Sequence, residues 1–179
     1  MTIPLIIGIM GRSRVGKDSI AEFIINEHPE YKIQRLSAPL KQAVKALYDF
    51  TSDQTETNEK EAIDERWNKT PRETIVSLTD YMMAYMGVDF FTKKLYHLYE
   101  TKQISQHMII PDIRYIHDVI EIQKRGGIVI KVLRSDASVV HEFEKNIEQF
   151  GGADHVIVND GSLDDLRNKV KTLLGSIKS

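Results

Sequence analysis

The feature that most constrains this chain is a short apolar run that leads directly into a glycine-rich loop. The run covers residues 4–10, and the loop continues as Gly11-Arg12-Ser13-Arg14-Val15-Gly16-Lys17. A buried strand, then G-x-x-x-x-G-K, then a helix surrounds an anion with backbone N–H groups and the positive end of a helix dipole. The pattern therefore predicts a nucleotide-phosphate loop in which Lys17 reaches the β- and γ-phosphates. The alternative is an ordinary glycine-rich turn between a strand and a helix.

The loop departs from the usual pattern directly after its lysine. Ser or Thr commonly follows, and its hydroxyl binds Mg²⁺; here Asp18 follows and the hydroxyl comes one place later, at Ser19. This order is more typical of a nucleotide kinase than of a GTPase.

Composition excludes several other classes of protein. The 179 residues suit one compact domain, and a net charge of −2 gives no electrostatic case for binding nucleic acid or a membrane surface. There are no cysteines, which excludes disulfides and cysteine metal sites. No apolar run reaches membrane-spanning length and no signal-peptide pattern is present, so the expected location is cytoplasmic.

Strand and helix patterns alternate along the chain. Strands are expected at residues 4–10, 33–36, 108–112, 128–133 and 155–159, and helices at 17–28, from 39, over 71–99 with a break at Gly87, at 116–125 and from 162. Short, continuously apolar strands separated by helices predict an α/β fold with a parallel sheet of about five strands, covered by helices on both faces. Residues 51–66 are expected to form a solvated loop or short exposed helix. The Met- and aromatic-rich stripe within 71–99 is expected to be core.

Cationic residues stand at places where they would serve phosphoryl transfer. That reaction requires alignment of two substrates, neutralised charge and exclusion of water. The candidates are Lys17, Lys41, Arg72, Arg114 and Arg134, with Asp112 beside them. Because Asp112 ends a buried strand, it has the position of a carboxylate that organises Mg²⁺ and its water; the alternative is a helix-capping aspartate.

Four blocks of this sequence resemble the deoxynucleoside monophosphate kinases of large DNA bacteriophages, a branch of the adenylate-kinase-like P-loop kinases. They are Gly16-Lys17-Asp18-Ser19, Leu36-Ser37-Ala38-Pro39-Leu40-Lys41, Ile110-Pro111-Asp112-Ile113-Arg114 and Asp154-His155-Val156-Ile157-Val158-Asn159-Asp160-Gly161-Ser162-Leu163. The resemblance implies a P-loop fold in which Lys41 faces the transferred phosphate. It also implies that the loop carrying Asn159 and Gly161 lies against the ATP adenine.

A fifth block and one long connection extend the resemblance. Arg72, Thr79 and Asp80 keep the spacing of a segment that holds the monophosphate, and Phe91 falls where an aromatic ring packs against the acceptor base. Leu78 departs from the glycine that relatives often have. The connection over residues 134–152, which includes His141 and Lys145 and ends in Gly151-Gly152, resembles the lid of these kinases.

The resemblance implies an ATP- and Mg²⁺-dependent enzyme that converts a deoxynucleoside monophosphate to its diphosphate. The expected acceptor region is 37–100, with Asp112 and Arg114 also near the acceptor. Lys17, Arg114, Arg134 and Asp112 are the expected catalytic residues. Mg²⁺ is held mainly by ATP phosphates and water, with Asp112 and Ser19 as candidates for direct contact. The expected partners of the enzyme are its two small substrates, and a homodimer is left open. If the source is viral, the expected location is the host cytoplasm.

Two other functions stay open. One is a kinase of the same superfamily with a non-nucleotide acceptor such as phosphomevalonate. The other is a nucleotide-binding switch that hydrolyses slowly.

Overall fold

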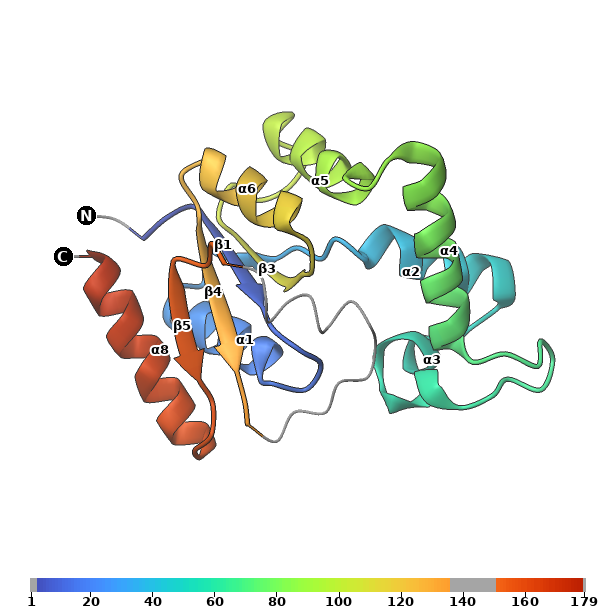
Figure 1. Ribbon diagram of the computed structural model, residues 1–179, viewed down its shortest axis with the longest axis horizontal. Helices are drawn as coiled ribbons and strands as arrows, with labels where there is room; N and C mark the ends of the chain where they lie inside the picture. Colours follow the sequence, from blue (N-terminus) through green and yellow to red (C-terminus); the bar gives the residue numbers. More distant parts are fainter. Residues whose placement is uncertain (1–2, 136–150, 179) are drawn as a thin grey trace. The chain divides into compact units, whose positions relative to one another are not determined.

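A parallel sheet forms the centre of the fold. The computed structural model describes residues 3–135 and 151–178, and within them the sheet has five strands in the order β2-β3-β1-β4-β5 (Figure 1). The strands are β1 (Ile6–Met10), β2 (Lys32–Ile33), β3 (Met108–Ile113), β4 (Ile128–Leu133) and β5 (His155–Val158). Every neighbouring pair is parallel, so the predicted fold class is confirmed.

The described helices alternate with these strands or lie between β2 and β3. They are α1 (Lys17–Glu27), α2 (Ala38–Tyr48), α3 (Ser52–Glu56), the 3₁₀ helix η1 (Asn58–Glu61), α4 (Pro71–Met86), α5 (Phe90–Glu100), α6 (Ile116–Lys124) and α8 (Leu163–Lys178). Ser162 caps α8 as predicted, since its hydroxyl accepts a hydrogen bond from the N–H of Asp165 at 3.2 Å. In the described ranges, no helix combines the length and apolar character that crossing a bilayer requires.

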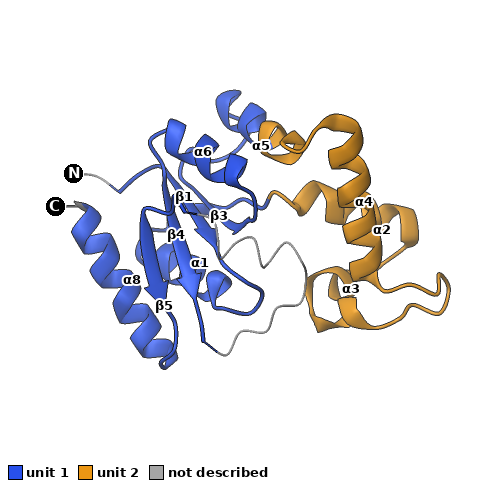
Figure 2. Ribbon diagram, viewed as in Figure 1, with its two compact units in different colours: residues 1–35, 95–179 blue, residues 36–94 orange. Residues whose placement is uncertain are grey.

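The chain separates into two compact units, coloured apart in Figure 2. Unit 1 comprises residues 1–35 and 95–179 and holds the sheet. Unit 2 comprises residues 36–94, close to the region 37–100 predicted for the acceptor. The description of the chain as a single kinase domain stays a prediction.

Unit 1 buries both faces of its sheet. On one face, α1 and α8 cover the strands with fully buried residues such as Ile20, Ile24 and Val170. On the other face α6 packs on β1 and β4, and the approach is close because a Cβ at Gly8 would lie 2.5 Å from the Cδ1 atom of Ile122 (Figure 1). Burial on both faces explains why the strands read as continuous apolar runs.

The strand order sets where a ligand can bind. β1 lies between β3 and β4, and Met10 is level with Ile113 on one side and Lys131 on the other. The residues that follow β1 therefore emerge between the carboxyl ends of two neighbouring strands. In open parallel sheets this is the edge at which ligands bind.

β2 is shorter than predicted and begins one residue earlier in the sequence. The expected strand was 33–36, whereas the paired residues are Lys32 and Ile33, which pair with Met108 and Ile109; a further hydrogen bond runs from Gln34 N–H to the Ile109 carbonyl at 2.9 Å. The apolar pattern could not locate this end, because it depends on where the chain leaves unit 1 for unit 2.

Unit 2 shows why the acidic segment 51–66 is ordered. Thr51 and Gln54 form a capping box at the start of α3, and Thr55 is fully buried. Asp64 is buried too, and its carboxylate accepts hydrogen bonds from Gln54 Nε2 at 2.9 Å and from Arg66 Nε and Nη2 at 2.9 and 2.7 Å. The segment therefore contains short helices, as one of the two predicted forms, but it is not solvated throughout.

The stripe over α4 and α5 differs from its prediction. The break at Gly87 is confirmed, since α4 ends at Met86. Tyr81 and Tyr85, however, are 63% and 75% exposed and stack on each other with ring centroids 6.1 Å apart. The expectation of a core role is therefore wrong for these two tyrosines, but it is confirmed for Leu95 and Tyr96 of α5, which are 6% and 3% exposed. An apolar stripe reports only one favourable face of a helix and not whether anything covers it.

Acid should weaken unit 2 through Asp64. The hydrogen bonds from Arg66, and then that from Gln54, hold the pKa of Asp64 well below its ordinary value. Since the pKa is depressed in the folded state, this stabilisation is present above the unfolded value of about 3.9 and is lost as pH falls through the folded value. The unfolding free energy can be followed by fluorescence of the single tryptophan, Trp67. Between about pH 5 and pH 2.5, we expect it to fall less steeply in Asp64→Asn than in the wild-type protein. The exposed neighbour provides the control Glu65→Gln, which should keep the wild-type slope; equal slopes in all three proteins would contradict the assignment.

Candidate active site

The loop after β1 has the backbone shape of a phosphate-binding loop. Gly11 and Gly16 both have positive φ, at 156° and 100°. Side chains would not fit there: a Cβ at Gly11 would lie 2.7 Å from the Val132 carbonyl oxygen, and one at Gly16 would lie 2.6 Å from Asn159 Nδ2. The two glycines of the motif are therefore required by close approach as well as by backbone conformation.

Lys17 lies at the start of α1 and its side chain turns back onto the loop. Its ammonium donates hydrogen bonds to the carbonyl oxygens of Gly11 at 2.9 Å and Arg12 at 2.5 Å. The cation therefore lies at the phosphate end of the loop, next to the helix N-terminus, where an anion is most strongly attracted.

Asn159 holds the loop from the end of β5, which is separated from β1 by β4. It follows β5, is only 7% exposed, and its amide Nδ2 donates to the Val15 carbonyl at 2.9 Å. Its own backbone N–H donates to the Leu133 carbonyl at 2.8 Å, which continues the pairing of β4 and β5. The predicted contact of Asn159 and Gly161 with adenine stays a prediction; sequence reasoning missed the role of the Asn159 side chain in positioning the loop.

Asp18 and Ser19 occupy the first turn of α1. Asp18 is exposed and accepts a hydrogen bond from Arg35 Nη2 at 2.6 Å. Ser19 lies two residues after the lysine, at the half-buried surface of the same turn. The predicted contact of Ser19 with Mg²⁺ stays a prediction.

The end of β3 carries the buried carboxylate that the sequence predicted. Asp112 is 8% exposed and lies inside β3, one residue before its end, whereas the predicted strand ended at Asp112 itself. Arg114 follows in a turn fixed by Asp118, whose Oδ2 accepts from the N–H groups of Arg114 at 3.2 Å and Tyr115 at 3.1 Å. Asp118 was not predicted, although a carboxylate three residues after Tyr115 has the spacing of a capping box.

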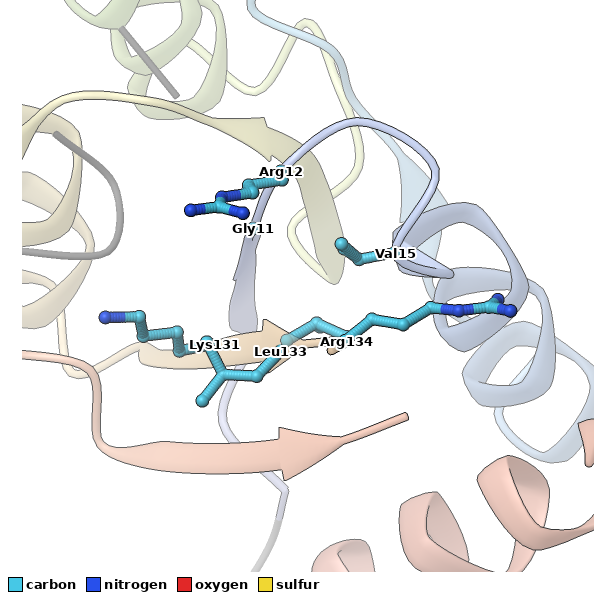
Figure 3. A pocket seen from close by; sticks show the side chains of 7 residues that line it. Gly11, Arg12, Val15, Lys131, Leu133 and Arg134 are labelled. Atoms are coloured by element: carbon cyan, nitrogen blue, oxygen red, sulfur yellow. The ribbon is translucent and has the colours of Figure 1, made fainter. Parts of the chain in front are cut away.

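A pocket joins the phosphate loop to the end of β4. It is lined by Gly11, Arg12, Val15, Lys131, Val132, Leu133 and Arg134 (Figure 3). Figure 3 shows that the side chains of Lys131 and Arg134 extend in opposite directions from β4 and its end. Arg12, Lys131 and Arg134 are cationic residues among those that line this pocket, which favours an anionic ligand. Lys131 was missed because, on a strand, it reads as one polar residue in an apolar run.

The remaining predicted site residues all belong to unit 2. Lys41 Nζ contacts Glu56 Oε2 at 2.5 Å, and Arg72 Nε contacts Glu61 Oε1 at 2.6 Å. Thr79 donates its hydroxyl proton to the Ile75 carbonyl at 2.7 Å, as is common within helices. The others are Asp80, which is exposed, and Phe91, whose ring packs edge-on against Phe90 with centroids 5.1 Å apart.

The predicted lid over 134–152 lies mostly outside the described residues, since 136–150 are not among them. The described residues at its two ends are hydrogen-bonded. Ser135 N–H donates to Asp160 Oδ1 at 2.8 Å, and Gln123 Nε2 donates to the Gly152 carbonyl at 2.6 Å. The described ranges also contain no group of three or more His, Asp or Glu side chains gathered as a metal site.

The bond from Asn159 to Val15 leads to a test. In Asn159→Asp the shape is kept but the donor is lost, and a carboxylate would face the Val15 carbonyl. We expect a loss of about 1–3 kcal/mol in unfolding free energy, measured in urea, together with weaker nucleotide binding. Asn168→Asp, the same change at an exposed position of α8, is the control and should behave as wild type. Wild-type stability and binding in Asn159→Asp would contradict the positioning role.

Solved structures of other proteins are similar to the structure of this chain. The structure is similar to dephospho-CoA kinase from Campylobacter jejuni, with a TM-score of 0.52, 13% sequence identity and 98% of each chain covered. It also matches a kinase candidate from Chloroflexus aurantiacus, with a TM-score of 0.45, 11% identity and 98% of each chain covered. No curated protein matches the sequence. The first similarity shows a P-loop kinase fold.

The family comparison is more specific. The family model for deoxynucleotide monophosphate kinase matches residues 76–170, more than half of the chain. The match includes Asp112, Arg114 and Arg134, while the phosphate loop and Arg72 precede it. A phosphate loop at the carboxyl edge of a parallel sheet, in a kinase fold with this family match, leads to one conclusion: the chain belongs to the deoxynucleotide monophosphate kinase family.

Proposed function

We propose that this protein transfers the γ-phosphoryl group of ATP to a deoxynucleoside monophosphate and releases ADP and the deoxynucleoside diphosphate. The observation that carries the proposal is the phosphate loop with Lys17 at the carboxyl edge of the sheet, next to the strand end that bears Asp112, in a member of this kinase family. The acceptor phosphate is already ionised at neutral pH, so its oxygen can attack without a general base. The protein's task is alignment and electrostatic stabilisation.

The donor side is assigned to unit 1. The N–H groups of the loop from Gly11 to Gly16 would hold the β- and γ-phosphates, and Lys17 would exchange its two carbonyl partners for phosphate oxygens. Arg114 and Arg134 would offset charge that develops on the transferred group. The adenine would lie near Asn159 and Gly161.

Magnesium fits the oxygen groups at this edge. Mg²⁺ commonly binds through one or two carboxylates together with substrate phosphates and water. Asp112 is a buried carboxylate at the end of β3, and Ser19 offers a hydroxyl in the first turn of α1. These two residues would hold the ion or its water shell, and the ion would neutralise charge on the β- and γ-phosphates.

The acceptor side is assigned to unit 2. Lys41 and Arg72 lie near the N-termini of α2 and α4, two helices that pack against each other. Helix N-termini attract anions, and both residues carry positive charge, which suits a monophosphate. Thr79, Asp80 and Phe91 would contact the nucleoside. That Asp112 and Arg114 also serve the acceptor stays an expectation from the sequence.

Other functions have less support. A non-nucleotide acceptor such as phosphomevalonate, or a slowly hydrolysing switch, would also use the phosphate loop, but the family match favours a deoxynucleotide acceptor. The bacteriophage origin, the host cytoplasm and a homodimer stay expectations from the sequence, as does the absence of a nucleic-acid partner.

The proposal is tested by ADP release from ATP and Mg²⁺, measured alone and with each of the four common deoxynucleoside monophosphates. We expect release to be much faster with at least one acceptor, because the site is built for transfer and not for hydrolysis. Lys17→Ala should lower acceptor-dependent turnover by about a hundredfold or more while the circular dichroism spectrum stays unchanged. Equal ADP release with and without every acceptor would contradict the kinase assignment.

Arg72→Ala separates the two substrates. An arginine can grip a phosphate through two N–H groups, so its loss should remove binding of the monophosphate. We expect the acceptor KM to rise about tenfold or more, kcat to fall less, and the KM for ATP to stay within about twofold of wild type. A rise in the ATP KM alone would place Arg72 on the donor side instead.

A further inference from the structure

Both cations assigned to the acceptor phosphate are paired with acids from the same short segment. Lys41 contacts Glu56 at the end of α3, and Arg72 contacts Glu61 at the end of η1. The segment 51–66 had no function in the sequence analysis beyond its acidic composition. Two ion pairs now connect this segment to the cations of the proposed acceptor site.

The pair between Arg72 and Glu61 has a geometry that leaves the phosphate-binding end of arginine available. The bond of 2.6 Å joins Glu61 Oε1 to Nε, on the side of the guanidinium. Within residues 3–135 and 151–178, neither Nη atom of Arg72 has a hydrogen-bond or ion-pair partner. The two Nη atoms form the fork that binds carboxylate or phosphate in two places.

Both members of the pair are mounted on well-fixed backbone. Thr57 caps η1 by accepting from the Glu59 N–H at 3.1 Å, and Thr70 forms a capping box with Glu73 at the start of α4. Pro71, directly before Arg72, is buried, and η1 packs against α4. The Arg72 side chain is 19% exposed, and that of Glu61 is 42% exposed.

We propose that Glu61 is a positioning residue for the acceptor site, and this rests on the proposed function. It holds the guanidinium of Arg72 through Nε so that both Nη atoms face the incoming phosphate of the deoxynucleoside monophosphate. Fixing the side chain before binding removes an ordering cost that would otherwise weaken acceptor affinity. Because Glu61 bonds the side of the guanidinium and not its fork, it does not occupy the place of the phosphate.

The pair of Lys41 and Glu56 supports this interpretation. An ammonium has three N–H donors, and Glu56 engages one of them at 2.5 Å, while the Lys41 side chain is 20% exposed. The acidic segment thus anchors one donor of each cation and leaves the others available to an anion.

The experiment compares Glu61→Ala, Glu61→Gln and the control Glu65→Ala, which removes the same charge from an exposed position in the same segment. Steady-state KM for the best deoxynucleoside monophosphate, KM for ATP and kcat are measured for each. We expect Glu61→Ala to raise the acceptor KM roughly tenfold with ATP KM unchanged. Glu61→Gln should be closer to wild type, since its amide oxygen still accepts from Nε. The control should match wild type.

A double-mutant cycle with Arg72→Ala tests whether Glu61 acts through the arginine. If it does, adding Glu61→Ala to Arg72→Ala should change the acceptor KM by less than about twofold. Additive effects of the two substitutions would overturn the positioning role, as would an unchanged or lowered acceptor KM in Glu61→Ala. A wild-type protein that releases no ADP in response to any deoxynucleoside monophosphate would instead overturn the proposed function, so the two failures are distinguishable.

Discussion

The amide of Asn159 donates a buried hydrogen bond to the Val15 carbonyl, and the shape of the phosphate loop depends on that contact. Gly16 has to lack a side chain because Asn159 Nδ2 would lie 2.6 Å from its Cβ, and Gly11 because the Val132 carbonyl approaches as closely. The loop is therefore held from both β4 and β5, strands far away in sequence. The shape of the loop therefore depends on the sheet as well as on the loop motif.

The strand order places other charged side chains at the same sheet edge as this loop. With β1 between β3 and β4, the buried carboxylate of Asp112 and the cations at the end of β4 lie at the same sheet edge as Lys17. Asp118 fixes the backbone of the turn at Arg114 by accepting two N–H groups. Positive charge is thereby gathered on rigid backbone before a substrate arrives, which is how phosphoryl-transfer enzymes limit reorganisation during the reaction.

Local sequence patterns predicted the backbone of this protein better than its side-chain partners. The motif at Lys17, the apolar strands and the break at Gly87 depend on neighbouring residues, so they could be read directly. The end of β2 and the exposure of Tyr81 and Tyr85 depend on how distant parts of the chain pack, which periodicity does not report. Glu61 and Arg72 are eleven positions apart and lie in different helices, so no spacing rule predicts their pairing.

The two hydrogen bonds of the Lys17 ammonium bear on how the loop would pass from one reaction cycle to the next. Its ammonium donates to the carbonyl oxygens of Gly11 and Arg12, so one side chain serves two backbone acceptors. In the proposed reaction, Lys17 would leave these carbonyls for phosphate oxygens when a nucleotide binds, and would return to them when the product leaves. On this proposal, the change between the two states of the loop is an exchange of partners by one ammonium group.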